Sequence, residues 1–344
     1  MKNRKTILYL VLFIVLIGLT LYAVISQSAS FTAEGFVDYI AAAKPVYLIC
    51  AVGSMLLYIL CEGLALLVLC RATGHPQKLH SGIMYSAADL YFSAITPSST
   101  GGQPASALLM MRDGIPGVTA TVVLLMNLAL YAASTLTISA LSFLLRPSAL
   151  GCFGTTSRLL IIIGVAVQAA LFAGILMLIY NARAFTKIAN FFWRIGQKLH
   201  LIRNVENHRA RLARMEQDYR LCGEMMHGHR GAIFGAFAFN LAQRIFLIAV
   251  TPLTYLAANG AASKAIDAFC MQMMVSVGSY CIPLPGSVGV ADYMALDGLG
   301  SFAADPVNLE LLARTVSFYA CILLCALALL ISYILRKINR RQNK

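Results

Sequence analysis

The stretch Thr96-Pro97-Ser98-Ser99-Thr100-Gly101-Gly102-Gln103-Pro104-Ala105 interrupts an apolar run in the 344-residue chain. Its prolines lack amide hydrogens, its adjacent glycines favour loop geometry, and its hydroxyl groups can bond to nearby backbone groups. We therefore expect a helix to break here. A second stretch, Pro283-Leu284-Pro285-Gly286-Ser287-Val288-Gly289-Val290-Ala291-Asp292, has the same character in the other half. The two breaks favour a transport pathway, with simple kinks in buried helices as the alternative.

The composition around these breaks is typical of a polytopic membrane protein. Hydrophobic residues make up 59% of the chain and charged residues 12%, with a mean hydropathy of +0.76. Soluble domains carry about 25% charged residues. The net charge of +13 comes from basic residues that cluster in loops and tails, as the positive-inside rule predicts. Because these loops hold few aromatic side chains that could stack on bases, we expect no nucleic-acid partner.

The cysteines and histidines do not predict a metal or redox site. Most of the nine cysteines lie within apolar stretches, and no Cys-x-x-Cys pair occurs. Such cysteines are usually small core residues. His227 and His229 lack the carboxylate and histidine neighbours of a metal site. We therefore expect no metal and no cofactor.

Hydropathy and charge predict six full membrane crossings with both termini on the cytoplasmic side. Arg146 and Arg158 are local exceptions to the charge rule, whereas Asp297, Asp305 and Glu310 suit an external loop. The predicted spans cover residues 6–25, 45–69, 116–145, 159–180, 232–257 and 311–335.

Residues 81–111 and 266–299 each hold one break between limbs that are too short to cross. The limb from Gly101 to Arg112 would rise roughly 16 Å as a helix, about half of a 30 Å hydrocarbon core. The order of spans places the two segments on opposite faces. The sequence thus predicts an all-α membrane protein with two re-entrant hairpins in inverted topology and a site near the midplane.

We interpret the whole chain as a single membrane domain in two halves, residues 1–182 and 231–344. Between them, residues 183–230 form a basic cytoplasmic linker. Apolar residues at helical spacing predict that its first part is an amphipathic helix on the membrane surface. It could bind anionic lipid headgroups or simply join the halves.

A helix that begins inside the bilayer points unpaired amide hydrogens and a positive dipole end at the space ahead of it. Pro104 suits the first turn of one half-helix, and Gly286 with Ser287 could open the other, with Ser287 as its cap. Two such ends could bind a phosphate group. The candidate substrate-binding residues are Thr96, Ser98, Ser99, Thr100, Gly101, Gly102, Gln103, Arg112, Arg244, Pro285, Gly286, Ser287 and Gly289.

Four ionisable residues, Glu62, Asp89, Arg244 and Asp292, are expected at depth, where each costs several kcal/mol unless it is paired or hydrated. We expect Arg244 to contact a lipid phosphate. The three carboxylates are candidate charge partners, with Asp89 and Asp292 facing a cationic headgroup or Arg244. The alternative is a buried brace between an arginine and carboxylates.

The two breaks, together with Arg112-Asp113-Gly114 at the end of the first hairpin, carry a resemblance to a known family. On these residues the chain resembles the transmembrane domain of the lysylphosphatidylglycerol synthase/flippase family. The likeness covers nearly the whole chain in span order. It implies a flippase that moves an aminoacylated or related phospholipid between leaflets of a bacterial plasma membrane and contributes to resistance against cationic antimicrobial peptides. Asp292 departs from the glutamate that often ends the family's second motif.

The sequence ends at Lys344, after the last predicted span. We therefore expect no tRNA-dependent aminoacyltransferase domain and no enzymatic activity, with the lipid supplied by a separate synthase. That synthase, membrane phospholipids and a second copy of the chain are the expected partners. A lipid-modifying transferase, or a scaffold acting through residues 183–229, remains an alternative. Downhill exchange, the membrane potential and proton coupling through Asp89 or Glu62 are possible energy sources.

Overall fold

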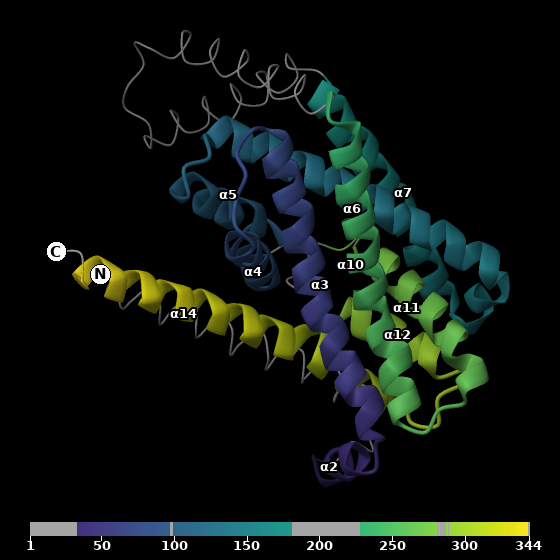
Figure 1. Ribbon diagram of the computed structural model, residues 1–344. Helices are drawn as coiled ribbons and strands as arrows, with labels where there is room; N and C mark the ends of the chain where they lie inside the picture. Colours follow the sequence, from purple (N-terminus) through teal and green to yellow (C-terminus); the bar gives the residue numbers. More distant parts are fainter. Residues whose placement is uncertain are drawn as a thin grey trace, which may run out of the picture.

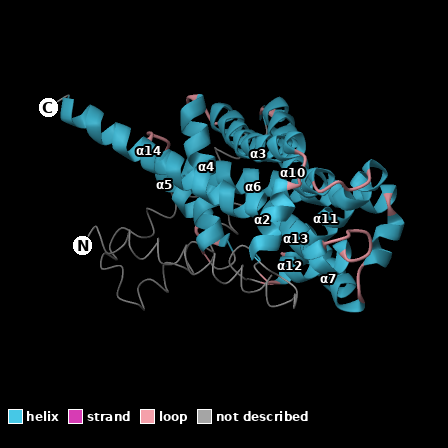
Figure 2. Ribbon diagram, turned by 90° about the horizontal axis from the view of Figure 1, so that it is seen from below, coloured by secondary structure: helices cyan, strands magenta, loops and turns pink. Residues whose placement is uncertain are grey.

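The computed structural model describes residues 33–96, 99–180, 228–280, 282, 287 and 289–342. This part of the chain is built from helices and loops and contains no strand (Figure 2), which confirms the predicted all-α class. In chain order the elements are α2 (Ala33–Ala41), α3 (Pro45–Ala72), α4 (Leu79–Ile95), α5 (Gly102–Arg112), α6 (Gly117–Leu145), η2 (Pro147–Cys152), α7 (Thr155–Tyr180), α10 (Arg230–Ala257), η3 (Ala262–Lys264), α11 (Ala265–Ser279), α12 (Val290–Leu299), α13 (Pro306–Arg314), η5 (Thr315–Ala320) and α14 (Cys321–Gln342).

Five helical stretches are long and apolar enough to cross a membrane, and they match five of the six predicted spans. They cover Pro45–Ala72, Gly117–Leu145, Thr155–Met177, Arg230–Ala257 and Pro306–Ser332. The predicted span at residues 6–25 lies outside the described residues, as does most of the predicted linker, residues 183–227. The chain is a multi-pass membrane protein.

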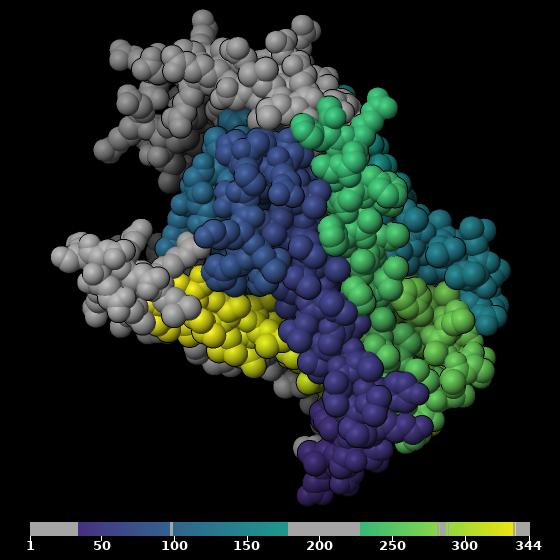
Figure 3. Space-filling model, viewed as in Figure 1, coloured from purple at the N-terminus to yellow at the C-terminus, as the bar shows by residue number. Residues whose placement is uncertain are grey.

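Helices α3 and α10 form the centre of the fold, and they lie side by side on the visible face in Figure 3. Leu66 and Leu69 of α3 pack with Tyr85 of α4, Met110 of α5 and Ala236 of α10 in one buried core. Figures 1 and 2 both place α4 and α5 to one side of α3 and α10, and α11 and α12 to the other. The two predicted breaks therefore lie on opposite sides of one central helix pair.

The first break joins α4 and α5 into an antiparallel hairpin. The Tyr85 hydroxyl near the start of α4 donates to Oδ2 of Asp113, just after α5, at 2.9 Å. Deeper in the hairpin, the Gln103 amide at the start of α5 donates to Oδ2 of Asp89 at 2.8 Å. The earlier residue of α4 is thus paired with the later end of α5, and the later residue of α4 with the start of α5. This order shows that the two helices are antiparallel.

The second break joins α11 and α12 in the same way. A Cβ atom on Gly298 would lie 2.8 Å from Cγ of Met271, and one on Gly278 would lie 2.4 Å from Cε of Met294. The first pair links the middle of α11 to the end of α12, and the second links the end of α11 to the middle of α12. Small residues thus let two helices approach closely in a second antiparallel hairpin.

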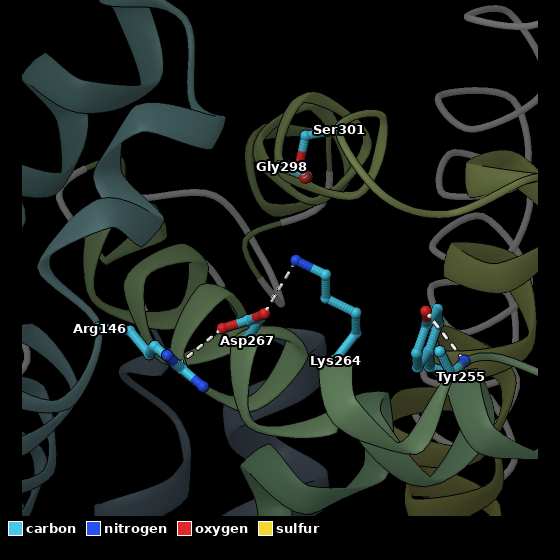
Figure 4. A network of polar contacts seen from close by, with 7 residues as sticks. Arg146, Tyr255, Lys264, Asp267, Gly298 and Ser301 are labelled. Carbon is cyan, nitrogen blue, oxygen red and sulfur yellow. Dashed lines mark hydrogen bonds and ion pairs between the residues drawn. The ribbon is translucent and has the colours of Figure 1, made fainter.

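Arg146, a predicted exception to the charge rule, is neutralised within the fold (Figure 4). Its Nε lies 2.9 Å from Oδ1 of Asp267, and Nζ of Lys264 lies 3.4 Å from the other oxygen of that carboxylate. At the same end of the molecule, the Tyr255 hydroxyl accepts a hydrogen bond from the Ala261 amide at 3.2 Å. The loop before α11 is therefore held by an ion pair as well as by hydrogen bonds.

The last span begins one turn earlier than predicted, because α13 is continuous with η5 and α14. Asp305 caps α13 by accepting a hydrogen bond from the Asn308 amide at 3.0 Å, and Pro306 fills the first helical position. Glu310, expected just before this span, lies within α13 and is only 4% exposed, so it belongs to the span itself. The π-helical segment η5 follows Arg314 directly. Segments of this kind are common at functional sites.

Candidate functional site

The first break is organised by hydroxyl groups, as predicted. The Thr96 hydroxyl donates to the carbonyl of Phe92 at 2.6 Å and accepts from the Gly101 amide at 2.9 Å. It therefore supplies partners to backbone groups left unpaired between the two helices. Ser99 adopts a φ of 54°, in the left-handed region. Ser98 lies outside the described residues.

Asp89 lies directly against the start of α5 and is 7% exposed. Ser93 donates to its Oδ1 at 3.1 Å, and Gln103 donates to its Oδ2 at 2.8 Å. Glycine is required at position 102, because a Cβ there would lie 2.0 Å from Oδ1 of Asp89 and 2.1 Å from the Ser93 hydroxyl oxygen. The structure therefore brings predicted residues Gly102 and Gln103 to Asp89.

Glu62 of α3 lies next to Asp89, and both side chains are buried. Oε2 of Glu62 accepts hydrogen bonds from Ser86 at 3.1 Å and from the Gln243 amide at 3.3 Å. The carboxyl groups of Glu62 and Asp89 are within hydrogen-bonding reach of each other. We refer to Glu62 and Asp89 as the carboxyl pair.

Arg244 of α10 is 1% exposed and is the largest fully buried side chain in the described part of the chain. Its guanidinium carbon lies 3.7 Å from the centre of the Tyr131 ring and 6.0 Å from that of Tyr280. Such stacking is a favourable cation–π contact. Within the described residues, neither Nε nor Nη1 of Arg244 has a hydrogen-bond partner.

Tyr280 extends this polar region towards the second break. It follows the end of α11, and its hydroxyl is hydrogen-bonded to that of Tyr131. Arg244 and Glu62 are close enough for their charges to interact, although they form no ion pair in the described structure. We call the carboxyl pair, Gln243, Arg244, Tyr131 and Tyr280 together the polar cluster.

The second break has a different electrostatic arrangement. Asp292 is fully buried; its Oδ1 lies 2.7 Å from Nε of Arg314, and its Oδ2 accepts from the Gly289 amide at 2.7 Å. The predicted role of Asp292 as a counter-charge for Arg244 is therefore wrong, since its partner is Arg314. The buried carboxyl of Glu310 faces the same pair.

Ser287 does not cap α12. The capping position belongs to Gly289, whose φ of 84° suits glycine, and the helix begins at Val290. The predicted substrate residues Pro285 and Gly286 lie outside the described residues.

Comparison with protein families gives a match to the lysylphosphatidylglycerol synthase TM region over residues 7–325. The chain belongs to this family. A comparison with curated proteins gave no match. The matched range of the lysylphosphatidylglycerol synthase TM-region family includes both breaks and the whole polar cluster.

Three other predicted site residues lie at the surface of the first hairpin, where the Ser99 carbonyl accepts a hydrogen bond from Ser93 at 3.3 Å. Ser99 and Thr100 are exposed in the first break, and Arg112 is exposed at the end of α5. Arg112 stands about 13 Å along the helix axis from Gln103. These three residues therefore surround the hairpin at its surface.

The sequence analysis did not identify Gln243, Tyr131 or Arg314 as parts of the two charged sites. Gln243 could have been found, because Asn240, Gln243 and Arg244 follow helical spacing and give α10 a polar face. Arg314 could have been predicted to pair with a carboxylate, because an unpaired charge inside the membrane is energetically costly. Tyr131 carries no such signal, because nothing in an apolar span distinguishes a tyrosine under a guanidinium from one in the core.

Proposed function

We propose that the protein is a phospholipid flippase of the bacterial plasma membrane. Its substrate is an aminoacylated, lysylphosphatidylglycerol-like or related anionic phospholipid. The headgroup crosses through the polar cluster while the acyl chains stay in the bilayer. Both hairpins are re-entrant and enter from opposite faces, with the chain termini in the cytoplasm. The protein moves lipid without changing it chemically.

The observation that carries this proposal is the buried guanidinium of Arg244 with two donors unpaired. An unpaired donor costs about 1–3 kcal/mol when buried, and more on a charged group. A phosphodiester oxyanion would supply the missing acceptors, and adjacent guanidinium nitrogens suit a bidentate contact. The Tyr131 ring fixes the plane of the guanidinium for that contact.

The placement of the two hairpins also supports a path through the protein. The α4–α5 and α11–α12 hairpins lie on opposite sides of α3 and α10 (Figure 1), and the polar cluster contains residues from both hairpins. Irregular backbone at membrane depth is tolerated where it is buried in protein or lines a wet cavity. Two hairpins of this kind in matching positions are typical of inverted-repeat transporters.

The test is leaflet exchange in liposomes that contain the purified protein. Fluorescent phosphatidylglycerol and lysylphosphatidylglycerol are placed in both leaflets, and an impermeant quencher reports the fraction that moves outward. We expect the protein to accelerate exchange over protein-free liposomes, with lipid masses unchanged. An altered lipid mass would support a transferase instead. If neither exchange nor chemical conversion is observed, the flippase is rejected and the scaffold role remains.

A further inference from the structure

The carboxyl pair is buried without a matching cation. Its hydrogen-bond donors are neutral: Ser86 and Gln243 for Glu62, and Ser93 and Gln103 for Asp89. In the described part of the chain neither carboxyl forms an ion pair. Two carboxylates in contact at low dielectric repel each other strongly, so such pairs usually share a proton.

Gln243 gives an independent sign of a proton at this place. Its side chain is 2% exposed, and its Nε2 donates to Glu62, yet its Oε1 has no partner in the described structure. An ionised carboxylate has no hydrogen to offer that acceptor. A protonated Glu62 has one, and could therefore satisfy the second half of the amide group.

The groups around the pair show how a proton and a lipid phosphate would be linked. The titratable neighbours of Glu62 are Tyr58 on its own helix, Asp89 on α4, Arg244 on α10, and Cys321 and Cys325 on α14. Only Arg244 brings a positive charge, so the pair with one shared proton and Arg244 together carry no net charge. A phosphate bound to Arg244 would add a negative charge, which favours a second proton on the pair.

We propose that Glu62 and Asp89 form a proton-binding site that couples proton movement to lipid movement. This rests on the proposed function. The proton enters from the aqueous phase on one side, forms an O–H bond on the pair as phosphate binds Arg244, and leaves to the other side when the lipid is released. By linkage, phosphate binding strengthens proton binding, and protonation strengthens phosphate binding by the same factor.

The first experiment measures binding of short-chain phosphatidylglycerol to the full chain in detergent over a range of pH. We expect affinity to rise as pH falls, by up to tenfold per pH unit for one linked proton. Glu62→Gln and Asp89→Asn should flatten this dependence, whereas Glu34→Gln, at an exposed position on α2, should not. Glycerol phosphate and inorganic phosphate serve as parallel probes, and binding of these alone would point to a free phosphate. A wild-type affinity that does not change with pH would overturn the proposal.

A second experiment detects the proton itself and needs neither transport nor ligand. Infrared difference spectra between the wild-type protein and each variant, Glu62→Gln or Asp89→Asn, at neutral pH should contain the C=O stretch of a protonated carboxyl group of the pair, while the buried Glu310 carboxyl contributes equally to both proteins and cancels. Its absence from the wild type would overturn the proposal even if both variants failed to fold.

The liposome assay separates failure of the coupling from failure of the flippase. If lipid exchanges between leaflets without a pH gradient, but a pH gradient does not make lipid accumulate in one leaflet, the coupling alone is rejected. Absence of all exchange would reject the flippase, while the infrared band would still decide whether the pair holds a proton.

Discussion

The two breaks place a carboxylate at the start of a short helix in each half, yet they neutralise it differently. Asp292 at the second break has Arg314 at 2.7 Å and also bonds to the backbone at the start of α12. Asp89 at the first break has only the neutral donors Ser93 and Gln103, with Glu62 beside it. The second site contains an ion pair, whereas the first contains none in the described structure, and its nearby positive charge is Arg244.

This difference separates a brace from a binding site. A buried ion pair holds two helices in one arrangement, and breaking it is costly. A carboxyl pair with neutral donors can change its protonation without losing those donors. A buried brace of the kind that the sequence left as an alternative for Arg244 is found at Asp292 and Arg314, and under the proposed function the first break is the one that binds the ligand.

The largest expected effect comes from breaking the brace with Arg314→Gln. This leaves the Asp292 carboxylate fully buried with no cation, and should cost about 3–5 kcal/mol of unfolding free energy. Equilibrium unfolding in mixed micelles measures the loss. The double variant Asp292→Asn with Arg314→Gln should recover part of it, because no charge is left unpaired. Equal losses in the single and double variants would contradict the brace.

Five of the six spans and the ends of the helices on either side of both breaks could be predicted, because hydropathy and the composition of the Pro/Gly stretches depend on local sequence. Thr96 is an example, since its hydroxyl needs only backbone groups within one or two turns. Gly102 and Gln103 were predicted only as substrate-binding residues, and their contact with Asp89 on the other limb of the hairpin was not predicted.

The pairing of distant charges could not be predicted, because it depends on how helices rotate and pack. Asp292 has two buried arginines on other helices within the same fold, and sequence spacing does not choose between Arg244 and Arg314. The cap of α12 was missed for a local reason: Ser287 suits an N-cap by residue type, but the backbone requires a positive φ at the capping position, which favours Gly289.

The next largest effect is expected at the first site from Arg244→Lys. A lysine keeps the charge but loses the planar fork and the stacking on Tyr131, so lipid exchange should fall about 10- to 100-fold, the equivalent of one or two charge-assisted hydrogen bonds. The folded protein should persist, because Arg244 completes no ion pair in the described structure. Liposome exchange and the unfolding midpoint are measured together.

Arg158→Lys is the matched control for that variant. Arg158 is exposed and donates to the carbonyls of Leu150 and Gly151, away from the polar cluster, so exchange should stay at the wild-type rate. If Arg244→Lys instead reduced the amount of folded protein and left exchange per molecule unchanged, Arg244 would be a brace like Arg314, and the contrast between the two breaks would disappear.

A smaller effect is expected from Gly102→Ala, which tests how tightly the first hairpin closes on Asp89. The added Cβ would lie 2.0 Å from Oδ1 of Asp89 and 2.5 Å from its backbone oxygen. Overpacking of this kind costs about 1–3 kcal/mol. Gly298→Ala in the second hairpin meets the Met271 side chain at 2.8 Å and the Phe153 ring at 2.9 Å, which is less close than the contacts at position 102, so it should cost less. Gly174→Ala on α7, with nothing within 4 Å, should be neutral or stabilising.

The smallest effect is expected from Tyr85→Phe, which removes the hydrogen bond between the α4–α5 limbs and leaves the ring in the core. The bond to Asp113 measures 2.9 Å, and its loss should cost about 0.5–1.5 kcal/mol in equilibrium unfolding. Tyr255→Phe is the counterpart near the second hairpin, where the bond to Ala261 is longer at 3.2 Å, so it should cost no more. The Tyr85 bond joins the two limbs of the first hairpin, whereas the Tyr255 bond lies between the end of α10 and the loop before α11, so the first hairpin should depend on its bond more than the second depends on Tyr255. A larger loss from Tyr255→Phe than from Tyr85→Phe would contradict this order.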